Sequence, residues 1–121
     1  MMSYDPSNIF ARILRGELPC KKIAEDDYTL AFEDINPQAP VHILVIPKGS
    51  YVDWSDFTSN ASEVEQTAFT KMVGHVADLS GIIGSGYRII SNNGNDGHQE
   101  VPHLHMHVLG GAAVGPMVSR R

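Results

Sequence analysis

The spacing of hydrophobic residues predicts a short helix near the start of the chain. Four of them repeat at three- and four-residue intervals, which places them on one face of a helix: Ile9, Phe10, Ile13 and Leu14. Asp5-Pro6 is typical of a helix start, because proline is tolerated in the first turn, and Gly16 is a natural stop. We therefore expect the helix to run between Asp5 and Gly16.

A longer helix is predicted in the middle of the chain, from Ala61 to Leu79. Its apolar stripe consists of residues three or four positions apart, namely Val64, Ala68, Met72, Val76 and Leu79. The preceding segment, Asp53 to Asn60, shows no hydrophobic period and is expected to be irregular.

Short hydrophobic stretches bounded by turn-forming residues predict strands. The strands are expected at Lys22 to Ala24, Tyr28 to Glu33, His42 to Ile46, Tyr87 to Ser91 and Val101 to Leu109. The order of one helix, three strands, one helix and two strands lacks the regular alternation of strand and helix that parallel sheets need. The predicted fold class is therefore α+β, with an antiparallel sheet of about five strands, one long helix and one short helix.

The size and composition of the chain predict a single globular domain. The 121 residues contain no linker and no repeat, so we expect one domain over residues 1–121, with a core of about 8–111 and a tail of 112–121. The formal charge of −5 argues against binding to duplex nucleic acid, and no apolar run is long enough to cross a membrane. Cys20 has no partner for a disulfide, and no signal peptide is visible, so we expect a cytoplasmic protein.

Histidine is concentrated near the end of the chain. His103, His105 and His107 alternate with three apolar residues, which are Leu104, Met106 and Val108. In a strand, successive side chains point to opposite faces, so the three imidazoles would share one face and the apolar residues would face the core. A strand surface that is rich in histidine without any function is the alternative interpretation.

Two kinds of chemistry suit such a row of imidazoles. Zinc accepts histidine ligands, but the outer two rings of a flat strand lie about 13 Å apart, so at most two neighbours could share one ion with a ligand from elsewhere. Alternatively, a neutral imidazole is a good nucleophile toward phosphorus, and its usual pKa of about 6.5 keeps it neutral at the pH of the cell. Its neighbours would then donate hydrogen bonds to phosphoryl oxygens or to the leaving group.

The histidine segment resembles the signature of the histidine-triad (HIT) family, in which three histidines alternate with hydrophobic residues. Further segments are similar to the HINT branch of that family: Asn8 to Phe10, Ile13 to Pro19, Ala31 to Pro40, His42 to Lys48, Gly86 to Arg88 and Gly97 to Val101. The ending, His107 to Gly111 with Gly115 to Met117, resembles the bacterial members of this branch.

This resemblance implies a HIT-like fold, a homodimer with a continuous sheet, and a site for purine nucleotides. It also implies hydrolysis of nucleoside phosphoramidates at the α-phosphate, so the expected partner is a purine nucleoside monophosphate or phosphoramidate. In that chemistry the middle histidine, His105, attacks phosphorus and carries the nucleotide until water releases the monophosphate. No metal and no cofactor is expected to take part.

The resemblance also implies roles for the other site residues. His103 and His107 would orient the nucleophile and bind phosphoryl oxygens, and His42 would be a more distant fourth histidine. Asp34 would hold ribose hydroxyls, and Asn92 would form a hydrogen bond near the phosphate. The remaining residues would form an apolar slot for the base (Ile9, Phe10, Ile13, Phe32 and Ile35) or offer backbone contacts to the phosphate (Glu100 and Val101).

Three features depart from the pattern of the family. Pro102 stands where many HINT proteins have tyrosine, Glu100 replaces the serine of animal members, and the tail has no tryptophan. Two other functions stay open on the sequence alone: a purine-nucleotide-binding regulatory protein with little turnover, and a zinc protein.

Overall fold

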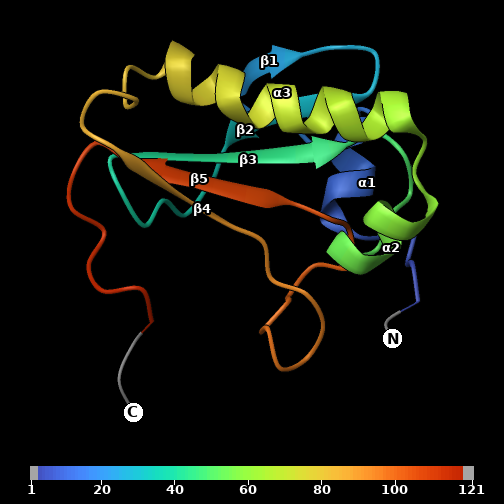
Figure 1. Ribbon diagram of the computed structural model, residues 1–121. Coiled ribbons are helices and arrows are strands. Elements are labelled where there is room, and N and C mark those ends of the chain that lie inside the picture. The colour runs from blue at the N-terminus through green and yellow to red at the C-terminus, as the bar shows by residue number, and fades with distance from the viewer. Residues whose placement is uncertain (1–2, 119–121) are drawn as a thin grey trace.

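Five antiparallel strands form one sheet in the order β1-β2-β3-β5-β4 (Figure 1). The strands are β1 Lys22–Glu25, β2 Thr29–Glu33, β3 Val41–Pro47, β4 Tyr87–Ile90 and β5 Met106–Gly110. The computed structural model describes residues 3–118, so the end of the predicted tail, 119–121, lies outside the described residues. The predicted α+β class with a five-stranded antiparallel sheet is confirmed.

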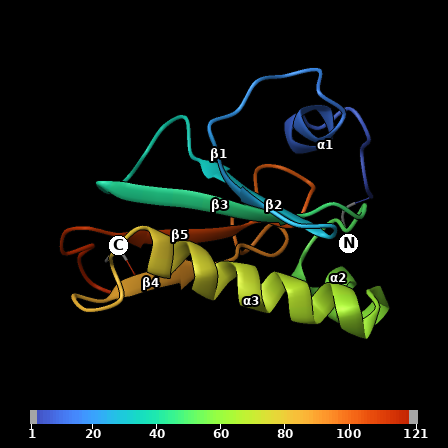
Figure 2. The ribbon, with the colours of Figure 1, turned by 90° about the horizontal axis from the view of Figure 1, so that it is seen from above.

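Helices cover both faces of this sheet. Figure 2 shows α3 Glu63–Leu79 along one face and α1 Ile9–Leu14 over the other. The central strand β3 is therefore buried on both sides: Ile43 and Val45 pack in the cluster under α3, whereas Leu44 and Ile46 pack in the cluster under α1. Burial on both faces explains why the His42 to Ile46 stretch is almost continuously hydrophobic.

Helix α1 begins later than predicted. The side chain of Asn8 accepts hydrogen bonds from the backbone N–H groups of Phe10 and Ala11, which makes Asn8 the residue that caps the helix. Asp5 and Pro6 therefore precede the helix, and the predicted start was wrong by about one turn. Gly16 follows the end of the helix with a φ of 78°, a conformation that glycine adopts without strain.

The segment predicted to be irregular contains a helix, α2 Trp54–Asn60. Its sequence is mostly polar, so hydrophobic spacing gives no signal for it. The helix starts because the side chain of Asp53 accepts a hydrogen bond from the backbone N–H of Asp56. Phe57 anchors it, with its ring against those of Tyr51 and Phe69.

The long helix α3 begins later than predicted, and the face that it buries differs from the predicted apolar stripe. Ser62 and Glu65 form a reciprocal capping box, so the helix begins at Glu63. Its buried face consists of Phe69, Met72, Val73, Val76 and Ala77. Val64 and Leu79, which the sequence stripe included, are 52% and 55% exposed. Each four-residue step drifts by about 40° around a helix, so the stripe leaves the buried face toward Val64, whereas the three-residue step from Val76 to Leu79 turns about 60° the other way.

The last predicted strand is also shorter than expected, because only Met106–Gly110 of the Val101 to Leu109 segment is strand β5. The ladder between β3 and β5 ends at the pair Val45 and Met106. Pro47 has no N–H to extend that ladder, and the N–H of Leu104 donates to the carbonyl of Tyr51 instead. His103 and His105 therefore lie in an irregular segment before the strand.

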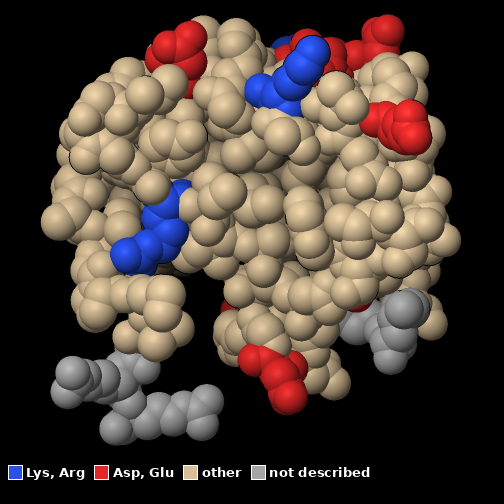
Figure 3. Space-filling view, viewed as in Figure 1, with Lys and Arg blue, Asp and Glu red and all other residues tan. Residues whose placement is uncertain are grey.

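The face seen in Figure 3 carries only scattered charges, and Lys and Arg do not gather there into a patch. Within residues 3–118, none of the helices has the length and hydrophobicity needed to cross a membrane.

The burial of Val76 and the exposure of Val64 on α3 lead to a stability prediction with a matched control. Val76 is fully buried, so Val76→Ala is expected to lower the free energy of unfolding by about 2–3 kcal/mol. Val64→Ala removes the same two methyl groups from an exposed position and is expected to change it by less than about 0.5 kcal/mol. Urea unfolding measures both variants, and equal losses would contradict the observed burial of α3.

Candidate active site

Four histidines from separate parts of the chain meet on the α1 face of the sheet. His42 comes from β3, His107 from β5, and His103 and His105 from the irregular segment before β5. The ring of His107 lies 5.1 Å from that of His42 and 5.1 Å from that of His105, centroid to centroid. Phe10 of α1 contacts the cluster, with its ring 4.9 Å from His105 and 6.3 Å from His103.

The predicted alternation of faces is found in this segment even where it is not a strand. Leu104, Met106 and Val108 all belong to the core cluster under α3. The three histidines contact Phe10 or one another on the opposite face. An extended chain keeps a side-chain period of two whether or not its backbone pairs with a neighbour.

Hydrogen bonds to the backbone determine which nitrogen of His105 carries a proton. Its Nδ1 lies 2.8 Å from the carbonyl oxygen of His103. A carbonyl only accepts, so Nδ1 donates, and in the neutral ring the lone pair must then be on Nε2. This Nε2 has no hydrogen-bond partner among residues 3–118 and is not fully buried. His105 therefore presents a free, nucleophilic nitrogen.

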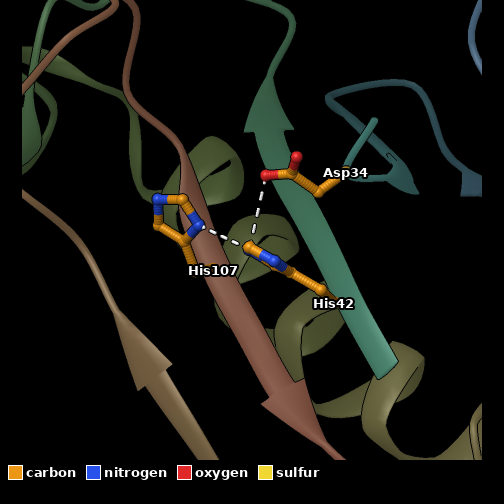
Figure 4. A group of neighbouring side chains, drawn as sticks. All are labelled: Asp34, His42 and His107. Carbon is orange, nitrogen blue, oxygen red and sulfur yellow. Dashed lines mark hydrogen bonds and ion pairs between the residues drawn. The ribbon is translucent and has the colours of Figure 1, made fainter. Parts of the chain in front are cut away.

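His107 carries its proton on Nε2, the opposite of His105, and the reason lies in its neighbour His42. The backbone N–H of Gln38 donates to Nδ1 of His42 over 3.0 Å, so the proton of a neutral His42 is on Nε2. That Nε2 lies 2.8 Å from Nδ1 of His107 and 3.4 Å from Oδ2 of Asp34 (Figure 4). Since His42 donates, Nδ1 of His107 accepts, and the proton of His107 is on Nε2. His107 therefore presents a hydrogen-bond donor.

Both ring nitrogens of His103 are occupied within the protein. Nε2 lies 2.8 Å from the carbonyl oxygen of Pro47, and Nδ1 lies 2.8 Å from the hydroxyl of Tyr4. The ring is completely buried. His103 thus has no nitrogen left for a ligand, and its contribution to the site is the backbone carbonyl that holds His105.

Burial keeps this cluster uncharged. Burial, helped by the positive charge that neighbouring imidazoles would carry, lowers the pKa of His103 and of His107 to about 4. Burial also lowers the pKa of His105 and of His42 from the usual value, while Asp34 opposes the shift at both rings. All four imidazoles are therefore neutral at pH 7, and each carries one proton.

The residues predicted to bind the nucleotide lie in different environments. Phe10 and Phe32 are buried core residues, and the centroids of their rings lie 5.7 Å apart. Ile13 packs partly buried against the same cluster. Ile9 is 47% exposed and Ile35 is 99% exposed. Ile9 and Ile35 adjoin in sequence Phe10 and Asp34, which contact the histidines, so these exposed apolar side chains are candidates for contact with a ligand.

Asp34 follows β2 directly and stands beside the histidines. Its Oδ1 accepts a hydrogen bond from the backbone N–H of Asn36 over 2.8 Å, and its Oδ2 faces His42. The side chain is only 17% exposed. The carboxylate keeps further lone pairs, so it can still accept hydrogen bonds from a ligand.

The loop before the histidines is held in place by Gln99. Its buried amide donates to the carbonyls of Val52 and Val101 and accepts from the N–H of Gly94. Glu100 points into solvent, 3.2 Å from Nε2 of His98, and Val101 packs partly buried against the cluster under α1. Asn92, at the start of the loop, is partly buried and has no side-chain hydrogen bond to any residue of 3–118. Its amide is free to reach a ligand.

A metal ion fits this donor set poorly. The ligand atoms of Asp34, His42 and His107 lie within 4.8 Å of one another, close enough to surround one ion. A metal needs a lone pair on Nε2 of His42, however, and that nitrogen carries the ring proton because the Gln38 N–H occupies the lone pair on Nδ1. Metal binding would place two N–H groups against each other.

Three contributors to the site could not be found by sequence reasoning. Gln38 and Pro47 act through backbone atoms, which leave no mark on residue type. Tyr4 lies 99 positions from His103 in the sequence, and no local pattern connects them.

Two open hollows of the surface lie apart from the four histidines. One, of about 460 Å³, lies beside α1 and is lined by Ile13, Leu14, Cys20, Lys22, Glu25, Leu30 and Lys48. Both lysines there form ion pairs with Glu25, which lowers the pKa of that carboxyl to about 2. None of the four clustered histidines lines this hollow, so the chemistry of the side chains, and not the size of a depression, identifies the candidate site.

Comparison with known proteins identifies related chains of similar length. An uncharacterised 13.2 kDa HIT-like protein of Azospirillum brasilense is 58% identical over 118 residues, which are 98% of this chain and 97% of that protein. The purine nucleoside phosphoramidase of Escherichia coli is 40% identical over 113 residues, which are 93% of this chain and 94% of the enzyme.

Among solved structures, a HIT family hydrolase of Clostridium thermocellum matches with a TM-score of 0.84 and 38% identity. The match covers 93% of this chain and 97% of that one. The profile of the HIT domain matches residues 15–114. Fold, histidine cluster and sequence agree, and the chain belongs to the HIT family.

Proposed function

We propose that this protein is a purine nucleoside phosphoramidase that cleaves P–N bonds at the α-phosphate of AMP-type substrates. The observation that carries the proposal is the hydrogen bond from Nδ1 of His105 to the His103 carbonyl, because it leaves the lone pair of His105 on the open Nε2. The 40% identity to the Escherichia coli phosphoramidase supports the same substrate class.

In the first step, Nε2 of His105 attacks the α-phosphorus while the P–N bond breaks. The electron pair of that bond leaves with the amine, which takes up a proton. His107 is placed to assist, because its Nε2–H donates to a phosphoryl oxygen or to the departing nitrogen. The product of this step is a nucleotide bonded to His105.

The imidazole bonded to the nucleotide carries a positive charge, and neighbouring groups stabilise this charge. The proton on Nδ1 stays hydrogen-bonded to the His103 carbonyl, whose negative end faces the charged ring. Asp34 lies on the same side of the sheet and adds a favourable electrostatic contribution. Water then attacks phosphorus and loses one proton to solvent, the bond to Nε2 of His105 breaks, and the nucleoside monophosphate leaves with His105 regenerated.

The nucleotide is held by the residues around the cluster. We assign Asp34 to the ribose hydroxyls and Asn92, together with the backbone of Glu100 and Val101, to the phosphate. The base would lie against Ile9, Ile13 and Ile35, with Phe10 and Phe32 forming the buried floor. This reaction needs neither a metal nor a cofactor. We also propose that residues 1–121 form one domain that works in the cytoplasm.

We further propose that two copies associate through β4. This strand is one of the two edges of the sheet, the other being β1, and it pairs only with β5 among the described strands. Tyr87 and Ile89 are 42% and 50% exposed on alternate positions, and Ile89 pairs with Val108, which faces α3. Leu79, at the end of α3, and Ile83, between α3 and β4, are also exposed, at 55% and 54%. An unpaired apolar edge is self-complementary under a twofold axis.

The role of His105 is tested by His105→Ala. The turnover of adenosine 5′-phosphoramidate is expected to fall on the order of 1,000-fold or more, because no other described nitrogen offers a free lone pair at the same place. Mass spectrometry of the quenched wild-type reaction should find a nucleotide adduct on His105. His75→Ala, on the exposed side of α3, is the control.

Equal turnover by His105→Ala and the wild type would contradict the proposal. AMP binding that survives in His105→Ala, with negligible turnover by the wild type, would instead indicate a nucleotide-binding regulatory protein.

The neutral cluster predicts that the free energy of unfolding decreases when the pH is lowered. Because folding lowers the pKa of His103 and His107 from about 6.5 to about 4, the unfolded chain binds more protons between these values. Each ring then lowers the free energy of unfolding by about 1.4 kcal/mol per pH unit as the pH drops through this range. Urea unfolding at several pH values should show a shallower dependence for His107→Gln and an unchanged one for His75→Gln. Identical slopes in all three proteins would contradict neutral burial of His107.

The association through β4 is tested by a charge at the edge. The wild type is expected to scatter light as a particle of twice 13.2 kDa at micromolar concentration. Ile89→Lys should give monomers, because pairing would bury an unpaired ammonium. Val64→Lys places the same charge at the opposite end of α3 and should leave the dimer intact. A monomeric wild type would contradict the proposal.

A further inference from the structure

The hydroxyl of Tyr4 reaches the most deeply buried histidine of the cluster. It lies 2.8 Å from Nδ1 of His103, and the two rings are 5.6 Å apart, centroid to centroid. Tyr4 precedes α1 and is outside residues 15–114, the part of the chain that matches the HIT domain. The segment before the common domain thus contributes a polar contact to the centre of the site.

The direction of this hydrogen bond follows from the other nitrogen of the ring. Nε2 of His103 faces the carbonyl of Pro47, which only accepts, so Nε2 carries the proton of the neutral ring. Nδ1 is then an acceptor, and the Tyr4 hydroxyl must be the donor. Without that donor, a fully buried lone pair would have no partner among residues 3–118.

The place of His103 matters because the strand ladder does not reach it. Residues 101–105 precede β5, and the last pair of the ladder to β3 is Val45 with Met106. Two backbone bonds hold the segment near His103, from its own N–H to Val101 and from Leu104 to Tyr51. Side chains from outside add the Gln99 amide on the Val101 carbonyl and the Ser91 hydroxyl on the His105 carbonyl. The ring of His103, fixed between Pro47, Tyr4 and Phe10, is the anchor that the segment itself supplies. The carbonyl of the same residue holds Nδ1 of His105.

Tyr4 is itself held firmly enough to act as part of the scaffold. The amide of Asn8, the residue that caps α1, donates to the carbonyl of Asp5 over 2.7 Å. The guanidinium of Arg15, at the other end of α1, donates to the carbonyl of Pro6 over 2.8 Å. Both ends of the helix therefore fix the segment that carries Tyr4.

We propose that Tyr4 is a positioning residue for the phosphoramidase reaction: its hydroxyl proton fixes the ring of His103, and the carbonyl of His103 then orients the attacking nitrogen of His105. This inference rests on the proposed function. It predicts that Tyr4 acts on the chemical step, since it touches neither the nucleotide site nor His105.

The test is Tyr4→Phe, which keeps the ring and removes only the hydroxyl. The kcat for adenosine 5′-phosphoramidate is expected to fall about tenfold, with KM changed by less than about twofold. Tyr51→Phe is the matched control: it also removes a tyrosine hydroxyl that bonds within the fold, here to Glu65 of α3, and it keeps the Tyr51 carbonyl that accepts from Leu104. It should lower the melting temperature and leave kcat unchanged.

A second readout follows the protons themselves. Nitrogen-15 NMR of the histidine rings should show wild-type His103 protonated on Nε2 and His105 protonated on Nδ1. In Tyr4→Phe, the signals of His105 should shift toward a mixture of its two neutral forms, whereas Tyr51→Phe should reproduce the wild-type spectrum.

The outcomes separate this inference from the proposed function. A wild type without phosphoramidase activity would refute the proposed function, and the spectra would still decide the arrangement of protons. An active wild type whose Tyr4→Phe variant keeps full kcat and an unchanged His105 spectrum would refute the role of Tyr4. If Tyr4→Phe does not fold, a wild-type spectrum with the proton of His103 on Nδ1 would refute it, and one with that proton on Nε2 would support it.

Discussion

Hydrogen bonds to the protein backbone place the protons of His42, His103 and His105, and His42 in turn places that of His107; the chemistry of the site depends on this. The carbonyls of His103 and Pro47 can only accept, and the N–H of Gln38 can only donate. Because burial keeps the rings neutral, each has a single proton, and fixing it on one nitrogen exposes the lone pair on the other. One reactive nitrogen, on His105, is thereby bare, and another, on His107, carries a proton. The two rings are adjacent, as attack and proton donation require.

The sheet supplies the rigidity that such an arrangement needs. β3 is buried under helices on both faces, and it carries His42 toward α1 between residues that fill the two core clusters. The pairing of Leu44 with His107 places the β5 histidine on the same face. Phe10 belongs both to the core under α1 and to the wall of the histidine cluster, so the packing of a short helix also sets the position of two imidazoles.

Much of this was predictable from the sequence, and the failures have physical causes. The shared face of His103, His105 and His107 follows from the alternation of side chains in an extended chain, which persists where the ladder ends. The HIT family membership expected from the same residues is confirmed. Helix α2 was missed because an Asp53 cap starts it in a mostly polar segment. The α3 stripe was wrong at Val64 because repeated four-residue steps drift around the helix, and at Leu79 because the last, three-residue step turns the other way. The contact of Tyr4 with His103 could not be predicted, since only the folded chain brings residues 99 positions apart together.

The use of main-chain atoms at Gln38 and Pro47 has a consequence for how this site tolerates change. A carbonyl or an N–H is present whatever side chain the residue bears, provided that the local backbone path is kept. Related chains can therefore diverge at position 38 without altering which nitrogen of His42 holds hydrogen, as long as proline is avoided there. A scan that replaces side chains one at a time will pass over such positions, although they govern the reactivity of the whole cluster.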